Sequence, residues 1–522
     1  MRSSKFVARI ALLLFAGVCL ASARARAEAK LPSLFSENMV LQAGARDPVW
    51  GTANPQERVT VTLGSAQATT TADASGRWKV EIGPLQPGGP FEMTVAGSNT
   101  IVIHNVLVGQ VWVCSGQSNM GFEVAPTPDV WGTGVEHYQK VIASANYPMV
   151  RMFTVDQTVA GEPQSNVGGK WKMTSPETVG HFSAVAYFFG LNLLKTLLEP
   201  IGLIHTSWGG TPAESWTTLP TLKSDPDFAG ILQTWQKEEQ GYPAEIANYN
   251  QELHDWEQAA KQAEAAGKPM PAAPRLPSDP RSNPWRPASL YNAMIAPLIP
   301  YRMEGVIWYQ GESNADRPIQ YRKLFPDMIR DWRRAWGEGN FPFLFVQLAS
   351  YQLANPPANW PLLREAQLMA LSLPKTAMAV TIDIGSASIV HPRNKQEVGR
   401  RLALAAQAVA YNQKVIYSGP TYSSMKIEGD KIRLHFTHLG GGLVALRLFG
   451  NPERLVGFTV AGADHKFMGA SARIEGDTVV VESNLVEHPL AVRYAWQNYP
   501  ICNLYNQAGL PASPFRTDDW TE

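Results

Sequence analysis

The feature that most constrains the fold is an alternation of apolar runs with helical stretches between about residues 106 and 412. The runs are almost continuously apolar, as is typical of strands that are buried on both faces. Strands that alternate with helices predict an α/β fold, in which helices cover a mainly parallel sheet. The predicted strands lie at 108–113, 201–204, 305–309, 343–348 and 377–384, and the predicted helices at 182–198 and 395–411.

The segments on either side of this region follow a β pattern. Alternating runs at 59–63 and 78–82, with Gly and Pro turns between them, predict a small β-sandwich-like domain over residues 28–105. The pattern returns after residue 412 and predicts a second such domain over 413–522. With 522 residues, 45% of them hydrophobic, the chain is long enough for these domains and a flavodoxin-like hydrolase domain over 106–412.

One stretch interrupts the strand–helix alternation, at about residues 225–287. Its first half is polar and helix-prone, and its second half is rich in proline. We interpret it as an inserted helix followed by an extended loop. It either forms a rim over the site or is a solvated hairpin.

The N-terminal 27 residues have the order of a signal peptide. Arg2, Lys5 and Arg9 precede the apolar residues 10–20, and a small-residue cleavage pattern, Ala-Arg-Ala, ends at Ala27. The apolar run is too short to span a bilayer, and no other stretch is long enough. We therefore expect an exported protein, periplasmic or extracellular, without a membrane span.

The composition and the motifs that are missing give no support to several classes of function. Lys+Arg and Asp+Glu are both 45, so charge gives no reason to expect a nucleic-acid partner. No His-x-x-x-His pair, carboxylate-rich loop, phosphate loop or dinucleotide fingerprint is present. We expect no metal and no cofactor. Cys114 and Cys502, which remain after signal removal, are expected to be buried small hydrophobes.

Four polar clusters each follow one of the apolar runs directly. In open α/β sheets, ligands bind at the carboxyl ends of the strands, so the clusters are expected to meet there. Each cluster alone is more often an ordinary turn or polar loop. The clusters are Gly116-Gln117-Ser118-Asn119-Met120, Trp208-Gly209-Gly210-Thr211-Pro212, Trp308-Tyr309-Gln310-Gly311-Glu312-Ser313-Asn314 and His391-Pro392-Arg393-Asn394-Lys395.

Each cluster has side chains or a backbone suited to acyl transfer. Ser118 follows a strand with glycine two residues before it, so its hydroxyl can be exposed on a tight turn. Met120 distinguishes this turn from the Gly-x-Ser-x-Gly elbow. The paired glycines at 209 and 210 allow backbone N–H groups to approach an oxyanion, and His391 can act as a base.

Taken together, the clusters closely resemble the sialate O-acetylesterase family of SGNH-type hydrolases. The likeness extends to segments outside the clusters, and so covers nearly the whole chain after the signal peptide. These segments are FSENMVLQ at 35–42, SLYNAMI at 289–295, NLYN at 503–506 and GLPASPFR at 509–516.

The resemblance implies a serine esterase that removes O-acetyl groups from sugars through an acetyl-enzyme. It makes Ser118 the nucleophile and His391 the base. Backbone N–H groups of Ser118 and Gly210, with the side chain of Gln310 or Asn314, become candidate oxyanion donors. Glu312 is expected to position other residues of the site without contacting the substrate. The neighbours of the serine, Gln117 and Asn119, are placed in the substrate-binding region.

One position departs from the family pattern. Members often carry an acidic residue two positions before the histidine, and here that residue is Ile389. The imidazole would then be oriented by Asp383, the tentative acid, or by Glu312, or by a backbone carbonyl near Ser388. Alternatively, the enzyme is a Ser–His dyad. Ile389 also supports a reading of another class, a carbohydrate-binding protein whose catalytic centre has decayed.

The sugar is the least constrained part of the prediction. Arg364 and Arg393 could hold the carboxylate of O-acetyl sialate, whereas Trp208, Trp308 and Trp360 suit the faces of plant-type sugars. We slightly favour acetylated hemicellulose-type oligosaccharides over sialate.

Overall fold

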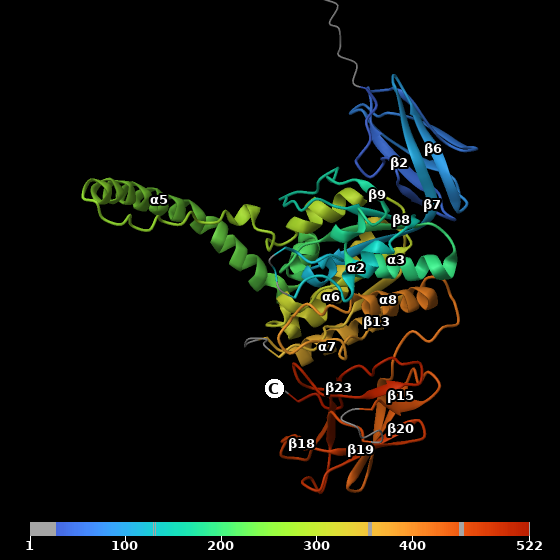
Figure 1. Cartoon of the computed structure of the whole chain (residues 1–522), viewed down its shortest axis with the longest axis vertical. Helices are drawn as coiled ribbons and strands as arrows, with labels where there is room; N and C mark the ends of the chain where they lie inside the picture. Colours follow the sequence, from blue (N-terminus) through green and yellow to red (C-terminus); the bar gives the residue numbers. More distant parts are fainter. Residues whose placement is uncertain (1–27, 129, 131, 353–357, 448–453, 521–522) are drawn as a thin grey trace, which may run out of the picture.

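The computed structural model describes residues 28–128, 130, 132–352, 358–447 and 454–520. The predicted signal peptide lies outside the described residues. Figure 1 shows an N-terminal β part at one end, a central body of sheet and helices, and a C-terminal β part at the other end, with one long helix projecting from the body. The predicted α/β class with flanking β parts is confirmed.

A mainly parallel sheet forms the centre of the body. Its strands follow the order β13-β12-β11-β7-β10-β8-β9, and every neighbouring pair is parallel except β8 with β9. The carboxyl ends of the parallel strands therefore lie along one edge. The strands are β7 (Thr100–Gly116), β8 (Tyr147–Thr154), β9 (Trp171–Thr174), β10 (Ile201–Ser207), β11 (Gly305–Tyr309), β12 (Phe343–Val346) and β13 (Thr376–Ala379).

Helices flank this sheet in packed pairs, α3 with α8 and α6 with α7. Burial of the strands explains their sequence: all residues of β10, β11 and β12 are buried. The body's helices are α1 (Ser118–Gly121), α2 (Tyr138–Ala143), α3 (Ala184–Leu197), α4 (Leu219–Ser224), α6 (Pro318–Trp336), α7 (Trp360–Met369) and α8 (Lys395–Val409).

The N-terminal part is joined to the body through a shared strand. β7 pairs with β1 and β6 near its start and with β10 and β11 near its end, so the expected boundary at residue 105 falls inside one strand. The other N-terminal strands are β1 (Val40–Gln42), β2 (Asp47–Thr52), β3 (Arg58–Leu63), β4 (Ala66–Thr71), β5 (Arg77–Ile82) and β6 (Gly88–Ala96).

The C-terminal part has its own hydrophobic core, which includes Ile432, Val460 and Val492. Its two larger sheets follow the orders β14-β15-β20-β19 and β18-β17-β21-β23. The strands are β14 (Thr421–Glu428), β15 (Lys431–Thr437), β16 (Leu443–Ala445), β17 (Phe458–Ala461), β18 (Met468–Gly469), β19 (Ser471–Glu475), β20 (Thr478–Glu482), β21 (Ala491–Tyr494), β22 (Leu504–Asn506) and β23 (Phe515–Arg516).

The inserted stretch contains the projecting helix, α5 (Ala229–Ala265). Its 37 residues bury only Ile231 and Ala260. The segment that follows runs back along the helix, with Trp256 Nε1 donating to Pro271 O at 2.8 Å. We call α5 and this return segment, up to residue 287, the arm. No helix among the described residues is both long and apolar enough to cross a membrane.

Candidate active site

The structure brings Ser118 and His391 together. Ser118 begins α1 immediately after β7, and His391 lies in the loop between β13 and α8. The Ser118 Oγ and His391 Nε2 atoms are 2.8 Å apart, a hydrogen-bond distance across 273 residues of chain. Glycine is required just before the turn, because Gly116 has φ of 140° and a Cβ there would lie 2.1 Å from Tyr309 O.

A buried polar network lies beneath this pair. Asn119 donates to Glu312 Oε1 at 2.6 Å and to Val390 O, next to His391, at 3.1 Å. Lys395 Nζ donates to Asn119 Oδ1. Lys395 is fully buried, with its ammonium 4.9 Å from the ring of Phe122 and 5.2 Å from that of Tyr309. The network ties the serine turn to the histidine loop.

Burial and this cation set the protonation of the site. Desolvation by burial, together with the charge of Lys395, lowers the pKa of His391 to about 4, so the imidazole is neutral at pH 7. Burial lowers the pKa of Lys395 to about 7, although Glu312 opposes that change. Burial also raises the pKa of Glu312, whose Oε2 has no partner among the described residues. A neutral imidazole is the form that can accept the serine proton.

The loop after β10 places backbone N–H groups beside the serine. A Cβ on Gly209 would lie 3.4 Å from Ser118 Cβ. No acceptor for the backbone N–H of Ser118 or of Gly210 is found within the described part of the chain. Both residues are partly exposed, so these two donors are free to bind an anionic group that reaches the serine.

The side chains of Gln310 and Asn314, the expected oxyanion donors, both donate to other protein groups in this structure. Gln310 is fully buried, and its Nε2 donates to Thr211 O at 3.3 Å and to Asn314 Oδ1 at 2.7 Å. Asn314 Nδ2 donates to Glu214 at 2.9 Å. Both amides therefore fasten the loop after β11 to the loop after β10. Gln117, also buried, accepts from the backbone N–H of Gly311 at 3.4 Å and plays a similar part.

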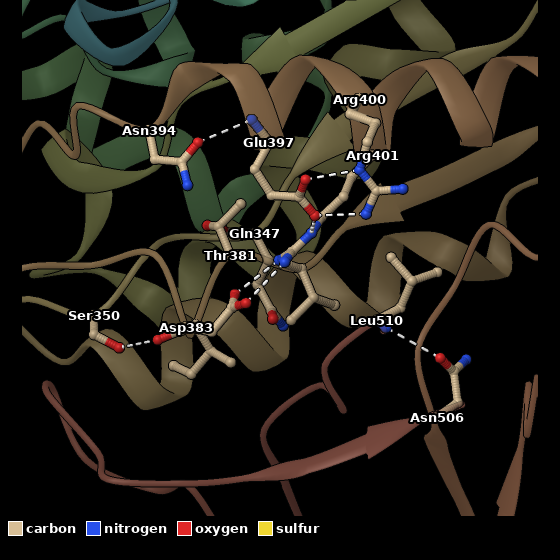
Figure 2. Close-up of polar contacts among 12 residues, drawn as sticks. Gln347, Ser350, Thr381, Asp383, Asn394, Glu397, Arg400, Arg401, Asn506 and Leu510 are labelled. Carbon is tan, nitrogen blue, oxygen red and sulfur yellow. Dashed lines mark hydrogen bonds and ion pairs between the residues drawn. The ribbon is translucent and has the colours of Figure 1, made fainter. Parts of the chain in front are cut away.

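Asp383, the tentative acid, faces a different partner. Both of its oxygens accept bonds from Arg401, each at 2.7 Å, and Arg401 also bonds Glu397 (Figure 2). Nothing in the described structure links Asp383 to His391. We therefore correct the tentative assignment of Asp383 as the acid that orients His391. Its carboxylate pairs with the buried guanidinium of Arg401 and not with the imidazole.

No hydrogen bond to His391 Nδ1 is found among the described residues. Glu312 Oε1 is occupied by Asn119, and the position two before the histidine is Ile389. The ring instead lies 6.3 Å from that of Phe122. Of the arrangements considered from the sequence, the geometry matches a Ser–His dyad, with the imidazole held by packing.

Most of the residues expected to recognise the sugar either bond to other protein groups or are buried. Arg364 is fully buried against backbone carbonyls, and Arg393 Nε donates to Gly134 O. Trp308 and Trp360 are buried too. Only Trp208 of the three named tryptophans is partly exposed.

Sequence reasoning gave no role to Lys395, although a signal existed. Lys395, Val398, Arg401 and Leu402 recur at the spacing of one helix face, and all four are buried. A lysine on that face, directly after a candidate base, predicts a buried cation near the site. Among the described residues, no group of three or more His, Cys, Asp or Glu is arranged to hold a metal ion.

Comparison with known proteins defines the class. A model of the family described as carbohydrate esterase, sialic acid-specific acetylesterase, matches residues 281–408. The fold is similar to that of a carbohydrate acetylesterase from Xanthomonas citri, with a TM-score of 0.78 and 36% identity, over 94% of this chain and 100% of that one. The protein is therefore a carbohydrate esterase.

Two curated relatives specify the family. The chain is 33% identical to the sialate O-acetylesterase of Mus musculus, over 93% of this chain and 94% of the relative. It is 31% identical to that of Homo sapiens, over 93% and 92%. The chain belongs to the sialate O-acetylesterase family.

Proposed function

We propose that the protein hydrolyses O-acetyl groups of sugars by a serine mechanism, with Ser118 as nucleophile and His391 as base. The observation that carries the proposal is the 2.8 Å contact between Ser118 Oγ and His391 Nε2, and the backbone N–H groups of Ser118 and Gly210, which have no acceptor among the described residues, support it. The lowered pKa of His391 supports it, because the imidazole is ready to accept a proton at neutral pH.

In this mechanism, His391 takes the Ser118 proton while Oγ attacks the acetyl carbonyl. The N–H groups of Ser118 and Gly210 stabilise the oxyanion. The sugar alcohol leaves with the proton from His391, and an acetyl-enzyme remains. His391 then takes a proton from water, which attacks the acetyl group; as the bond to Ser118 Oγ breaks, His391 returns the proton to that oxygen and acetate leaves. Lys395 keeps Asn119, and through it the histidine loop, in place.

The test is acetate release by the purified protein and by Ser118→Ala. We expect the variant to lose at least about a thousandfold in kcat, by analogy with the removal of a triad serine. A variant that folds normally and turns over at the parent rate would remove the mechanism. If the parent itself binds acetylated sugar but releases no acetate, the protein is a binding protein.

We propose acetylated neutral oligosaccharides as the substrate, ahead of O-acetyl sialate. Arg364 and Arg393, the basic side chains considered for the sialate carboxylate, both bond to backbone carbonyls instead. Acetate release from an acetylated xylo-oligosaccharide and from O-acetyl sialate, measured at equal concentration, separates the two. A higher kcat/KM on sialate would reverse the order.

We also propose that the protein is exported, on the basis of the charge–apolar–small order of its first 27 residues. Expression with and without those residues, followed by fractionation, tests this. We expect the longer chain outside the cytoplasm and shortened near Ala27.

A further inference from the structure

A pocket lies between the base of the arm and the loops of the active site. It has a volume of about 530 Å³, and its lining includes Ile231, Trp235 and Glu238 of α5, Trp285 of the return segment, and Pro212 and Ser313. Pro212 and Ser313 belong to the loops after β10 and β11, which also carry Gly210 and Glu312. The pocket therefore lies beside two of the loops that carry the proposed acetyl site.

Trp285 connects the pocket to the nucleophile. Its Nε1 lies 4.0 Å from the position of a Cβ on Gly210, and the neighbouring Gly209 lies against Ser118. The indole is 51% exposed, the one tryptophan among the exposed large hydrophobic side chains of the described structure. A flat apolar ring left open to solvent beside a reactive serine is suited to the C–H face of a sugar.

The arm holds Trp285 in this position. Arg286, the next residue, forms an ion pair of 2.7 Å with Glu239 of α5, and Asn283 Oδ1 accepts from the backbone N–H of Trp285 at 2.9 Å. Arg281 lies over the Tyr242 ring at 5.9 Å. These contacts fasten the return segment to the helix, so the pocket has a fixed wall on the side of the arm.

The charges that line the pocket favour a neutral sugar over an anionic one. Its charged lining residues are Glu214, Glu238, Asp316 and Arg317. The one cation, Arg317, already bonds Glu214 at 2.6 Å and lies 3.7 Å from Asp316. A sialate carboxylate would meet excess negative charge here, whereas neutral hydroxyls can donate to these carboxylates.

We infer that this pocket, formed by Trp285 and the base of the arm, is a subsite for a neutral sugar unit of the acetylated oligosaccharide. The inference deepens the proposed function and rests on it. It gives the insertion a role: the arm supplies one wall of a cleft that the sheet and its loops leave open. It also makes recognition of the chain separable from attack on the acetyl group.

The test compares Trp285→Ala and Trp285→Phe with Trp256→Ala, a control that removes a tryptophan from the same arm outside the pocket lining. We expect Trp285→Ala to lower kcat/KM on an acetylated xylo-oligosaccharide about tenfold, the loss of one aromatic stacking contact. The loss should lie mainly in KM. Trp285→Phe should retain most of the activity, and Trp256→Ala nearly all.

Two further substrates make the result specific. Nitrophenyl acetate, too small to fill the pocket, should be hydrolysed by Trp285→Ala within about twofold of the parent rate, and O-acetyl sialate likewise. No loss on the oligosaccharide, an equal loss on nitrophenyl acetate, or an equal loss in Trp256→Ala would overturn the subsite. An equal loss on O-acetyl sialate would overturn its neutral character.

A binding measurement tests this inference independently of the proposed reaction. Calorimetric titration of Ser118→Ala with deacetylated xylo-oligosaccharide needs no turnover, and we expect the Ser118→Ala/Trp285→Ala double variant to bind about tenfold more weakly. If Ser118→Ala keeps full esterase activity, the mechanism fails while this titration still decides the subsite. Equal binding by both proteins would overturn the subsite alone.

Discussion

At the scale of single residues, the protonation of His391, the proposed base, is influenced by a lysine that bonds neither the serine nor the lining of the proposed sugar pocket. Lys395 is buried below Asn119 and faces Phe122 and Tyr309, and the charge of Glu312 favours its protonated form. Its charge opposes protonation of His391. The lysine thus favours the neutral base and braces the loop that carries it.

The pH dependence of the reaction follows from this arrangement. In the proposed mechanism, His391 acts as a base only when it is neutral, which is above its folded pKa of about 4. We expect kcat/KM on nitrophenyl acetate to fall tenfold per pH unit below about 4 and to be level from there to neutrality. In Lys395→Met the opposing cation is gone, so the pKa of His391 rises and the acid limb of the pH profile moves to higher pH, while burial, the larger cause, still keeps that pKa below its ordinary value. Lys466→Met, at an exposed site, should leave the limb in place. An unmoved limb in Lys395→Met contradicts the role of the lysine.

Asp383 gives a residue-scale test of the dyad. Its two bonds to Arg401 predict that Asp383→Asn lowers the free energy of unfolding by about 1.5–3 kcal/mol, through loss of a charged partner. We expect kcat on nitrophenyl acetate to change by no more than about threefold, because the imidazole keeps its surroundings. Denaturant unfolding and initial rates measure the two effects. A loss near ten-thousandfold in a folded variant would restore Asp383 as the triad acid.

At the scale of elements, the strand–helix alternation predicted the arrangement well, because burial on both faces leaves a clear apolar pattern. It also brought the loops with Ser118 and His391 to one edge, since parallel strands end together. The partner of Asp383 was not predictable from strand ends, because Arg401 enters from the inward face of α8. The position of Trp285 was not predictable either, because the proline-rich return segment has no apolar periodicity from which its path could be inferred.

The arm offers an element-scale prediction. Beyond its base, α5 buries only Ala260, and Arg281 lies over Tyr242 where the helix and the return segment are close. Excision of residues 246–277, with a short Gly-Ser linker in their place, keeps Trp235, Glu238 and Trp285. We expect the thermal midpoint to stay within about 2 °C and oligosaccharide turnover to stay unchanged. A fall of more than about 5 °C, or a loss of turnover, would show that the outer arm supports the body.

At the scale of the whole molecule, the body is joined to its two β parts in different ways. The N-terminal part shares β7 with the central sheet, so its connection is a continuous backbone ladder. The C-terminal part has a separate core, and hydrogen bonds join it to the body, among them the backbone bond from the N–H of Tyr351 to Asn498 O at 3.0 Å. Arg364 of α7 is the central contact, since it donates to Leu348 and Ala349 of the body and to Gln497 and Asn498 of the C-terminal part.

Arg364 should therefore control how firmly the C-terminal part is held. Burial lowers its pKa to about 9, still above neutrality, so the guanidinium remains charged and its bonds, at 2.8–2.9 Å, are charge-assisted. In Arg364→Met four carbonyls lose their donor, and we expect the free energy of unfolding to fall by about 3 kcal/mol or more.

Arg58→Met, at an exposed site on β3, is the matched control and should change the free energy of unfolding by less than about 0.5 kcal/mol. Urea unfolding followed by tryptophan fluorescence measures both variants. Equal midpoints for the two would mean that the C-terminal part is held by its remaining contacts, among them the ion pair of Arg516 with Glu365 at 2.7 Å.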